Sequence, residues 1–443
     1  MTSRTWKRAI PLVVALAVVA SACGGRESDS SSSSTTAAAT KAFINPADDC
    51  TDYQGTAGIT GDTIKVGTIR PASGPYAVYD QVTTGLGAYF TAQNAAGGIT
   101  AGDGKKYKVE LVKEDDGYDP GRTPAVAKKL VEQDKVFALV GVIGTKNNEA
   151  IRDYMNEACV PNLALATGSP EWGKANEFPW YISALPSYAT EAHAWVEYLK
   201  TAKPEAKIAL LYQDDDFGLA YKNAITKAVN GTKITLVADQ SFNPLSGGTT
   251  EAATTQLSQS GADVFIVGLG GTPCPKTLSF VPETWKPTTI ISVTCGSKTA
   301  LALAGGKDQG VLMAQATLDP ADATDAKTPQ VQDFLKQGAT GGLDQAQMEG
   351  GIASVGWGFG ALFAKGLSAT KTVDRAGIQN ALFQVQKDGT FGLVRPDVDV
   401  KTDNATDPWL IEGFRIVERS GTNWTEKAPM QNWNGKSNSF AGN

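Results

Sequence analysis

The strongest constraint on the fold is a strand–loop–helix unit in residues 64–99. Residues 64–69 form a short apolar run with the composition of a buried parallel strand. A loop rich in proline and glycine ends this run, and Leu86, Tyr89 and Phe90 then repeat at helical spacing. An Asn and a Gly-Gly pair predict the end of the helix, because both residue types accept left-handed backbone angles. Such a loop after a strand is the usual place for a ligand in an open α/β sheet, although an ordinary βα unit has the same pattern.

The same alternation continues along the chain in two series. Further strands are predicted at 108–113, 136–140, 162–166 and 180–184, and then at 207–212, 234–239, 264–267, 289–293 and 311–316. Three helices without parallel strands of their own follow, and residues 409–417 form the last clear strand. This order predicts an α/β fold of two doubly wound parallel-sheet lobes, joined by a three-stranded hinge, with a ligand cleft between them.

The chain divides by this pattern into six segments. They are a signal peptide (1–22), a tether (23–50), the first lobe in two parts (51–184 and 316–408), and the second lobe in two parts (185–315 and 409–443, which includes the tail).

The N-terminus has the features of a targeting segment. Three basic residues, Arg4, Lys7 and Arg8, precede an apolar stretch, as in a secretory signal peptide. Cys23 follows small residues and resembles the lipidated cysteine of a bacterial lipobox, although Leu or Val is more usual at the position of Ala20. Residues 28–40 are nearly all Ser, Thr and Ala, which predicts a flexible tether. We therefore expect a lipid-anchored protein on the outer face of the cytoplasmic membrane or in the periplasm; plain secretion is the alternative.

Four further cysteines suit an exported chain with two disulfides, for which three connectivities exist. Cys274 and Cys295 each follow one of two consecutive predicted strands, so we expect them to pair and leave Cys50 to pair with Cys159. Four buried free thiols are the alternative. The sequence has no CxxC motif and only one histidine, His193, so no metal site is expected.

Several function classes are disfavoured by composition and motifs. The net charge is −6 and no basic cluster follows the N-terminus, which argues against a nucleic-acid partner. A Ser/His/Asp hydrolase would have to use His193, but no G-x-S-x-G motif occurs. The glycines of residues 268–271 lack the lysine and spacing of a phosphate-binding loop. We therefore expect no cofactor.

Several motifs occur in an order that resembles one known family. The first strand is followed by Ser-Gly-Pro from Ser73 and by Asn-Ala-Ala-Gly-Gly-Ile from Asn94. A second motif begins Asp-Pro-Gly-Arg at Asp119, and a third combines the strand at 207–212 with Asp-Phe-Gly from Asp216. Together they resemble the leucine/isoleucine/valine-binding-protein family of ABC-transporter receptors over residues 62–417. The resemblance implies a monomeric, bilobed receptor of the type I periplasmic binding fold, which closes on a solute and docks on a membrane permease.

The resemblance also implies ligand contacts from the first lobe. Tyr79 stands where the family places an aromatic residue against the ligand. Thr145 stands where a hydroxyl at a helix N-terminus binds the ligand carboxylate, and a simple helix cap is the alternative. The loop after the next strand supplies backbone N–H groups and a hydroxyl. Residues Ala166, Thr167 and Gly168 occupy that loop, with an alignment open by one residue.

The second lobe departs from the amino-acid-binding pattern. The family tyrosine that opens its face becomes Phe217, and a second tyrosine becomes Gly270. The carboxylate that pairs with a ligand ammonium becomes Thr294. A buried ammonium without a counter-charge costs several kcal/mol. One of the three acidic residues at 214–216 is a possible substitute, and a solvated acidic loop is the alternative.

The expected function is therefore a receptor for a small carboxylate- or amide-bearing solute, of the branched-chain amino-acid type or a related, including aromatic, type. We expect the solute to lack an ammonium group. The alternatives are a ligand-sensing co-receptor of the same fold and, less favoured, a hydrolase on a similar scaffold.

Overall fold

The computed structural model describes residues 43–386 and 389–442. The predicted signal peptide, Cys23 and the tether at 28–40 lie outside the described residues. Within the described ranges, no helix has both the length and the apolar character needed to cross a membrane.

The first sheet is built around one long strand. Its order is β3-β4-β2-β5-β6-β7, and β1 pairs with β2 outside this path. The strands are β1 (Ile59–Thr60), β2 (Thr63–Arg70), β3 (Ile99–Thr100), β4 (Lys106–Asp115), β5 (Leu139–Val140), β6 (Asn162–Leu165) and β7 (Tyr181–Ser183). The pairs β2–β4, β2–β5, β5–β6 and β6–β7 are parallel, whereas β1 and β3 are short antiparallel additions. The predicted strand at 136–140 is shorter than expected, because only its last two residues pair with a neighbouring strand: Leu139 with β2 and β6, and Val140 with β6 alone.

The second sheet has the order β14-β13-β12-β11-β10-β8-β9. Its strands are β8 (Lys207–Gln213), β9 (Thr235–Phe242), β10 (Val264–Gly268), β11 (Thr288–Ile291), β12 (Leu312–Gln315), β13 (Gly413–Ser420) and β14 (Asn423–Asn432). Strands β8 to β12 are parallel, and every residue of β10 is buried, as expected for a central strand covered on both faces. The last two strands form an antiparallel hairpin at one edge.

The hairpin is where the sequence prediction differs most from the structure. The strand expected at 409–417 begins at Gly413 and continues to Ser420, and β14 was not expected at all. Most residues of β14 are exposed, because it is an edge strand with one neighbour. An edge strand of polar residues carries no apolar run from which to predict it.

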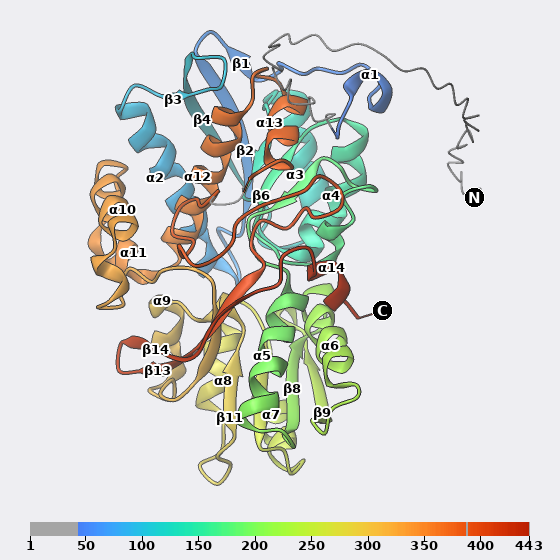
Figure 1. Ribbon diagram of the computed structural model, residues 1–443, viewed down its shortest axis with the longest axis vertical. Coiled ribbons are helices and arrows are strands. Elements are labelled where there is room, and N and C mark those ends of the chain that lie inside the picture. The colour runs from blue at the N-terminus through green and yellow to red at the C-terminus, as the bar shows by residue number, and fades with distance from the viewer. Residues whose placement is uncertain (1–42, 387–388, 443) are drawn as a thin grey trace, which may run out of the picture. The chain divides into compact units, whose positions relative to one another are not determined.

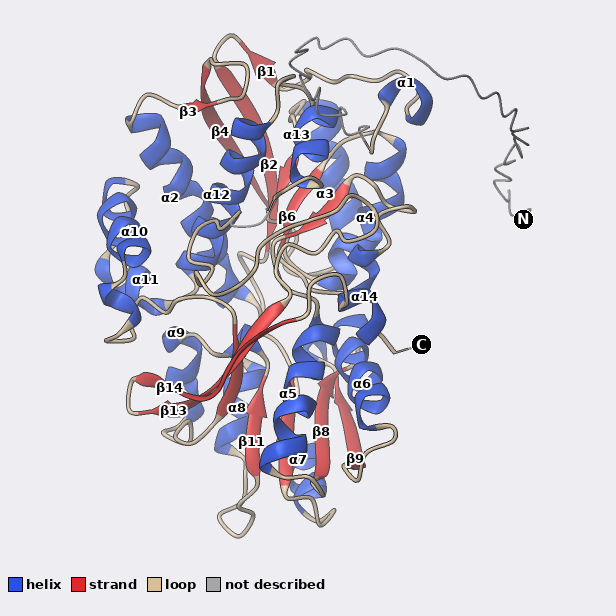
Figure 2. Ribbon diagram, in the orientation of Figure 1, coloured by secondary structure: helices blue, strands red, loops and turns tan. Residues whose placement is uncertain are grey.

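Helices cover both sheets (Figures 1 and 2). With the first sheet lie α2 (Asp80–Ala95), α3 (Thr123–Lys128), α4 (Thr145–Glu157), α10 (Pro329–Thr340), α11 (Gln345–Gly350), α12 (Ala353–Ala369) and α13 (Arg375–Leu382). With the second lie α5 (Tyr188–Ala202), α6 (Asp216–Val229), α7 (Glu251–Ser258), α8 (Pro273–Ser279) and α9 (Lys298–Leu301). As expected, the late helices α10 and α12 pack on α2 of the first series. The two-lobed α/β fold is therefore confirmed, with the chain passing between the sheets after β7, after β12 and before β13.

Helices α2 and α12 pack unusually closely. A Cβ atom at Gly356 of α12 would collide with the carbonyl oxygen of Val82, and one at Gly85 of α2 would collide with the carbonyl of Ala353. These two glycines therefore allow backbone-to-backbone contact between the helices. The contact holds the segment after β12 against the first sheet.

Both expected disulfides are present. Cys50 pairs with Cys159 and Cys274 pairs with Cys295, with Cα atoms 6.1 and 6.0 Å apart. The structure differs from the expectation of a tether that reaches residue 50. Ile44 is 2% exposed and its N–H donates to Asn380 Oδ1 at 2.8 Å, so residues 43–50 pack on the folded chain.

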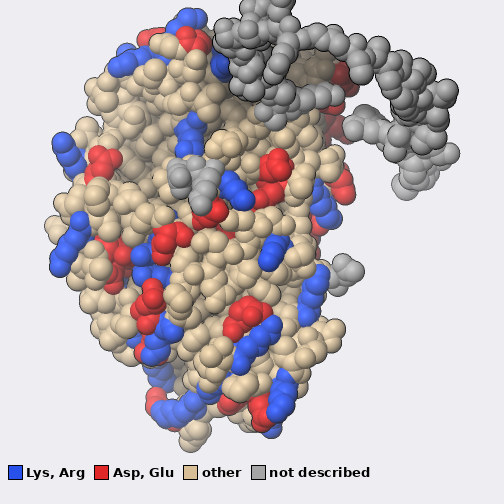
Figure 3. All heavy atoms as spheres, viewed as in Figure 1, with Lys and Arg blue, Asp and Glu red and all other residues tan. Residues whose placement is uncertain are grey.

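Charged side chains of both signs are interspersed on the face shown in Figure 3, with broad uncharged areas between them. On that face the described residues do not separate by sign into an acidic and a basic half.

Candidate functional site

A cavity of about 200 Å³ lies between the two sheets, at the carboxyl ends of their parallel strands. Its lining comes from segments that follow nearly every parallel strand: Tyr76, Tyr79, Tyr118, Gly144, Thr145, Ala166, Leu185, Phe217, Gly270, Thr294 and Thr317. The loops at these strand ends are where an open α/β sheet binds its ligands. The cavity is smaller than the pockets of about 300–1,000 Å³ that bind drug-sized molecules, which favours a small solute.

Six of the eight predicted ligand residues line this cavity: Tyr79, Thr145, Ala166, Phe217, Gly270 and Thr294. Thr167 and Gly168 do not. Thr167 is fully buried behind the wall, and the carbonyl of Gly168 accepts a hydrogen bond from the Tyr188 N–H at 2.8 Å. Of the three loop residues, Ala166 is therefore the one that lines the cavity.

The N-terminus of α4 forms a site suited to an anion. The helix begins at Thr145 after Gly144, whose φ of 104° lies in the region that favours glycine, and no side chain caps its first turn. The free N–H groups and the helix dipole favour a negative charge at this point. The Thr145 hydroxyl lies 2.6 Å from the Thr167 hydroxyl, so Thr167 orients Thr145 from behind.

Tyr79 lines the cavity with its ring, but its hydroxyl is engaged elsewhere. The hydroxyl accepts a hydrogen bond from the Gly271 N–H at 2.6 Å and donates one to the Thr294 carbonyl at 3.0 Å. Burial raises the pKa of this hydroxyl, so it stays protonated and able to donate. Tyr79 therefore joins the loop after β2 to two loops of the second sheet.

Neighbouring residues strengthen this junction. The Tyr76 hydroxyl is hydrogen-bonded to Gln213 Oε1, and the Tyr76 ring stacks on Tyr118 with 3.7 Å between centroids. The Thr272 hydroxyl donates to the Pro75 carbonyl at 3.3 Å. With Tyr79, these contacts close one side of the cavity with groups from both sheets.

More aromatic side chains line the cavity than the sequence indicated. Phe217 lies in the first turn of α6 and meets Tyr188 edge to face, with 4.8 Å between ring centroids. Tyr188, Phe359 and Phe391 also line the cavity and were not predicted. Tyr188 opens a helix directly after a crossing between the sheets, a position that could have suggested it. Phe359 and Phe391 come from segments whose packing on the first sheet no local pattern reveals.

Thr294 lines the cavity with a neutral side chain. The Thr294 hydroxyl contacts the Leu269 carbonyl at 3.3 Å and the Ser292 hydroxyl at 3.0 Å. The acidic loop does not supply a carboxylate instead. Asp215 caps α6 by accepting from the Gly218 N–H at 3.2 Å, and Asp216 pairs with Lys146. Neither lines the cavity.

Two other carboxyl groups lie at or near the wall. Asp319, from the segment after β12, is the one acidic residue among the described lining residues, and its Oδ1 accepts from the Ala321 N–H at 2.8 Å. Burial raises the pKa of Asp319. Glu191 lies behind the wall and accepts from the Val293 N–H at 2.7 Å and from the Tyr221 hydroxyl at 2.6 Å. Burial raises the pKa of Glu191 to about 8.

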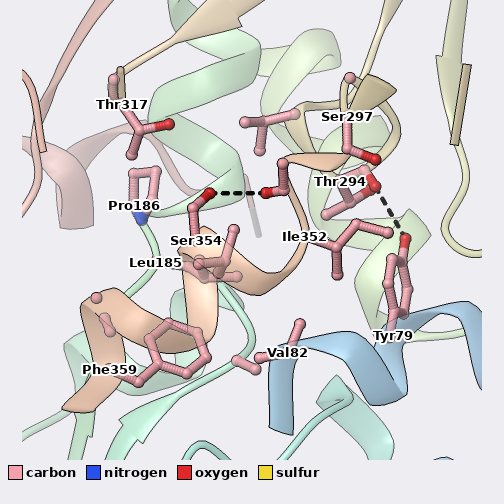
Figure 4. A pocket seen from close by; sticks show the side chains of 18 of the residues that line it. Tyr79, Val82, Leu185, Pro186, Thr294, Ser297, Thr317, Ile352, Ser354 and Phe359 are labelled. Carbon is pink, nitrogen blue, oxygen red and sulfur yellow. Dashed lines mark hydrogen bonds between the residues drawn. The ribbon is translucent and has the colours of Figure 1, made fainter. Parts of the chain in front are cut away.

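The rest of the lining is mainly apolar. It comes from α12, from the segment at 391–394 and from the start of the last crossing, and includes Ile352, Val355, Gly358, Phe359, Phe391, Leu393, Val394 and Ile411. Figure 4 shows Tyr79 and Thr294 on one side of the cavity and Phe359, Leu185 and Thr317 on the other. His193 is not part of the lining; it stacks on Phe440 with 3.8 Å between centroids.

Comparisons with known proteins agree with the two-lobed fold. Residues 63–410 match a family described as periplasmic binding protein. The Leu/Ile/Val-binding protein of Escherichia coli K12 is 27% identical over 166 residues, which are 37% of this chain and 43% of that protein. An amino acid binding protein of Pseudomonas aeruginosa is 26% identical over 216 residues, 46% of this chain and 53% of that protein. The chain thus spans about half the length of the curated relatives it matches.

Solved structures share the fold. A branched-chain amino acid ABC transporter protein of Thermus thermophilus with bound valine has a TM-score of 0.74 at 17% identity, covering 85% of this chain and 98% of that one. A solute-binding protein of R. palustris in complex with 4-hydroxybenzoate has a TM-score of 0.67 at 20% identity, covering 84% and 97%. A fatty acid ABC transporter substrate-binding protein of Thermomonospora curvata has a TM-score of 0.71 at 17% identity, covering 87% and 96%.

Proposed function

Since the chain belongs to the periplasmic binding protein family, we propose that it is the extracytoplasmic receptor of an ABC importer. It captures a small carboxylate- or amide-bearing solute between its two lobes and delivers it to a membrane permease. The first lobe comprises 51–184 and 316–408, and the second comprises 185–315 and 409–443. Lipidation at Cys23, after removal of residues 1–22, anchors the receptor to the membrane as a monomer.

One observation carries the choice of solute: an uncapped helix N-terminus opens into a cavity whose other walls are mainly apolar and aromatic. A carboxylate placed at Thr145 meets free N–H groups and the positive end of the helix dipole. An aliphatic or aromatic body then lies against Tyr79, Phe217 and α12. An amide oxygen can occupy the same position, but without the gain that a full charge obtains from the dipole.

The ammonium group of an amino acid has no partner at Thr294. A charge buried without a partner is strongly unfavourable, so we propose that the solute lacks it. The neighbour with bound 4-hydroxybenzoate supports such a ligand for this fold.

Asp319 supports one competing candidate. It is the acidic residue of the described lining, so a ligand ammonium placed beside it would be paired. The relatives named for leucine, isoleucine and valine agree with that candidate. The variant Asp319→Asn distinguishes a simple carboxylate from an amino acid as the ligand. For a simple carboxylate, the substitution removes a charge of the same sign. For an amino acid, it removes the charge that would pair with the ligand ammonium. We expect this variant to bind simple carboxylates about two- to fivefold more tightly. Loss of amino-acid binding in the variant would establish the competing candidate.

A thermal-shift screen of the purified protein tests the proposal. The panel contains amino acids, amides, and aliphatic and aromatic acids. A ligand at 100 times its Kd stabilises the folded state by about 2.7 kcal/mol, which raises the Tm by several degrees. We expect such shifts with acids. Shifts confined to branched-chain amino acids would contradict the proposed solute, and turnover of an ester or amide would contradict a purely binding function.

A further inference from the structure

The cavity extends along α12. One lining residue of that helix, Gly358, has no side chain and so leaves room in the cavity. Gly358 is buried and lines the cavity. A Cβ atom built at Gly358 meets no atom within 4 Å. Phe359 and Val355 line the same region (Figure 4 labels Phe359).

The other glycines of α12 are different. A Cβ at Gly356 would collide with the Val82 carbonyl, one at Gly360 would lie 2.6 Å from the Tyr89 ring, and one at Gly366 would lie 2.9 Å from Leu382. Close packing against neighbouring elements therefore accounts for those three positions. It does not account for Gly358, where alanine would fit and would favour the helix more than glycine does.

Two polar side chains of the cavity lining are engaged within the protein. Ser354 Oγ donates to the Gly351 carbonyl at 2.9 Å, and Gln315 Oε1 accepts from Arg415 at 2.6 and 2.9 Å. Thr317 presents a hydroxyl and a methyl group to the cavity. The region along α12 therefore suits an apolar part of a ligand rather than a second polar group.

We infer that Gly358 determines specificity by keeping open a compartment for the apolar end of a monocarboxylate. This inference rests on the proposed function, in which Thr145 and the N-terminus of α4 hold the carboxylate. The ligand class is a straight aliphatic or phenylalkyl acid whose chain length is limited by the space at Gly358. A side chain at position 358 would reduce the length of the longest acid that fits in the cavity.

The test measures affinity for a homologous series by calorimetry: straight-chain acids from propionate to decanoate and phenyl acids from benzoate to 4-phenylbutyrate. In the wild-type protein each methylene that the compartment accepts is expected to raise affinity about fourfold, up to the longest chain that fits. Gly358→Ala shifts the optimum to a shorter acid. Gly358→Leu removes binding of the longer acids while the shortest still bind.

Gly87→Ala is the matched control. Gly87 lies inside α2, where a Cβ meets first the end of the Lys113 side chain at 3.2 Å, and it does not line the cavity. Gly87→Ala raises the helix propensity of α2 as Gly358→Ala raises that of α12. Because residue 87 lies outside the cavity, the acid length that binds most tightly should stay that of the wild type. An unchanged optimum in both Gly358 variants, with acids still bound, would overturn this inference alone. Failure of every acid to bind the wild-type protein would overturn the proposed function and the ligand class with it.

Discussion

At the scale of single residues, Tyr79 shows that lining a cavity and binding a ligand are separable roles. Its ring faces the cavity, while its hydroxyl bridges the Gly271 N–H and the Thr294 carbonyl. These bonds join segments of the two lobes, so they stabilise the closed form whatever ligand it holds. A ligand binds more tightly when the closed form is easier to reach.

Tyr79→Phe should therefore weaken all ligands by a similar factor. Two hydrogen bonds of about 0.5–1.5 kcal/mol each are lost, which corresponds to a loss of affinity of about tenfold. Calorimetry with two acids of different shape checks this expectation. A loss confined to one of the acids would show instead that the hydroxyl contacts the ligand.

In contrast to Tyr79, Thr145 should affect ligands selectively, because its hydroxyl faces the expected position of the ligand carboxylate. A hydrogen bond to a charged group contributes about 1.5–3 kcal/mol, so Thr145→Ala should weaken carboxylates at least tenfold. Thr145→Ser keeps the hydroxyl and should restore most of the affinity. Equal affinities in the Ala and Ser variants would show that the Thr145 hydroxyl does not bind the ligand.

At the scale of elements, helices α4 and α6 meet across the cavity through three charged residues. Lys146 pairs with Asp216 of α6 and lies 3.3 Å from Glu149 of its own helix. Burial and the neighbouring Asp216 raise the pKa of Glu149 to about 8. Although burial acts in the other direction, hydrogen bonds with Glu149 and Lys146 hold the pKa of Asp216 below its ordinary value. The charged groups at this contact are these three, with Asp215 beside Asp216 on α6.

This contact predicts that ligand affinity depends on pH. When the lobes separate, Glu149 leaves Asp216 and its pKa falls towards the ordinary value of 4.5. The closed form therefore binds a proton that the open form releases, so affinity is highest below about pH 4.5, falls as the pH rises towards about 8 and is constant above it. Between pH 6 and 9 the solute carboxylate stays ionised, so it does not contribute to the pH dependence. Because one proton is taken up on closure, the affinity can change by at most about tenfold per pH unit.

Glu149→Gln is the control for this effect. The variant cannot ionise at this position, so its affinity should vary little between pH 6 and 9. Calorimetry at four pH values compares the two proteins. A wild-type affinity that is independent of pH, or that rises with pH, would contradict the proposed coupling.

The predicted elements also show where local sequence suffices. Apolar runs identified every strand from β8 to β12. Strands β8, β10 and β12 are almost entirely buried, so their apolar composition alone is enough to predict them. Even β9, at the sheet edge, kept enough apolar residues to be predicted. The exposed strand β14 and the short helix α8, which begins with two prolines among its first three residues, gave no such signal.

At the scale of the whole molecule, the site was predictable only in part. Thr145 and Phe217 follow strands directly, so the sequence places them at the edge where ligands bind. Gly358 and Phe391 reach the same cavity only because the segment after β12 returns to pack on α2. That return depends on contacts between distant residues, such as Gly356 against Val82. The segment that we propose to limit the length of the solute was therefore harder to predict than the residues at the strand ends.

The central claim is that the cavity accepts a carboxylate and offers a ligand ammonium group no counter-charge at Thr294. Calorimetric titration with two matched pairs tests it most directly: 4-methylpentanoate against leucine, and 3-phenylpropionate against phenylalanine. Within each pair the molecules differ only in the ammonium group. Because a buried unpaired charge costs about 3–5 kcal/mol, the account predicts that each acid binds at least about 100-fold more tightly than its amino acid. Leucine or phenylalanine binding as tightly as its matched acid, or more tightly, would contradict the account.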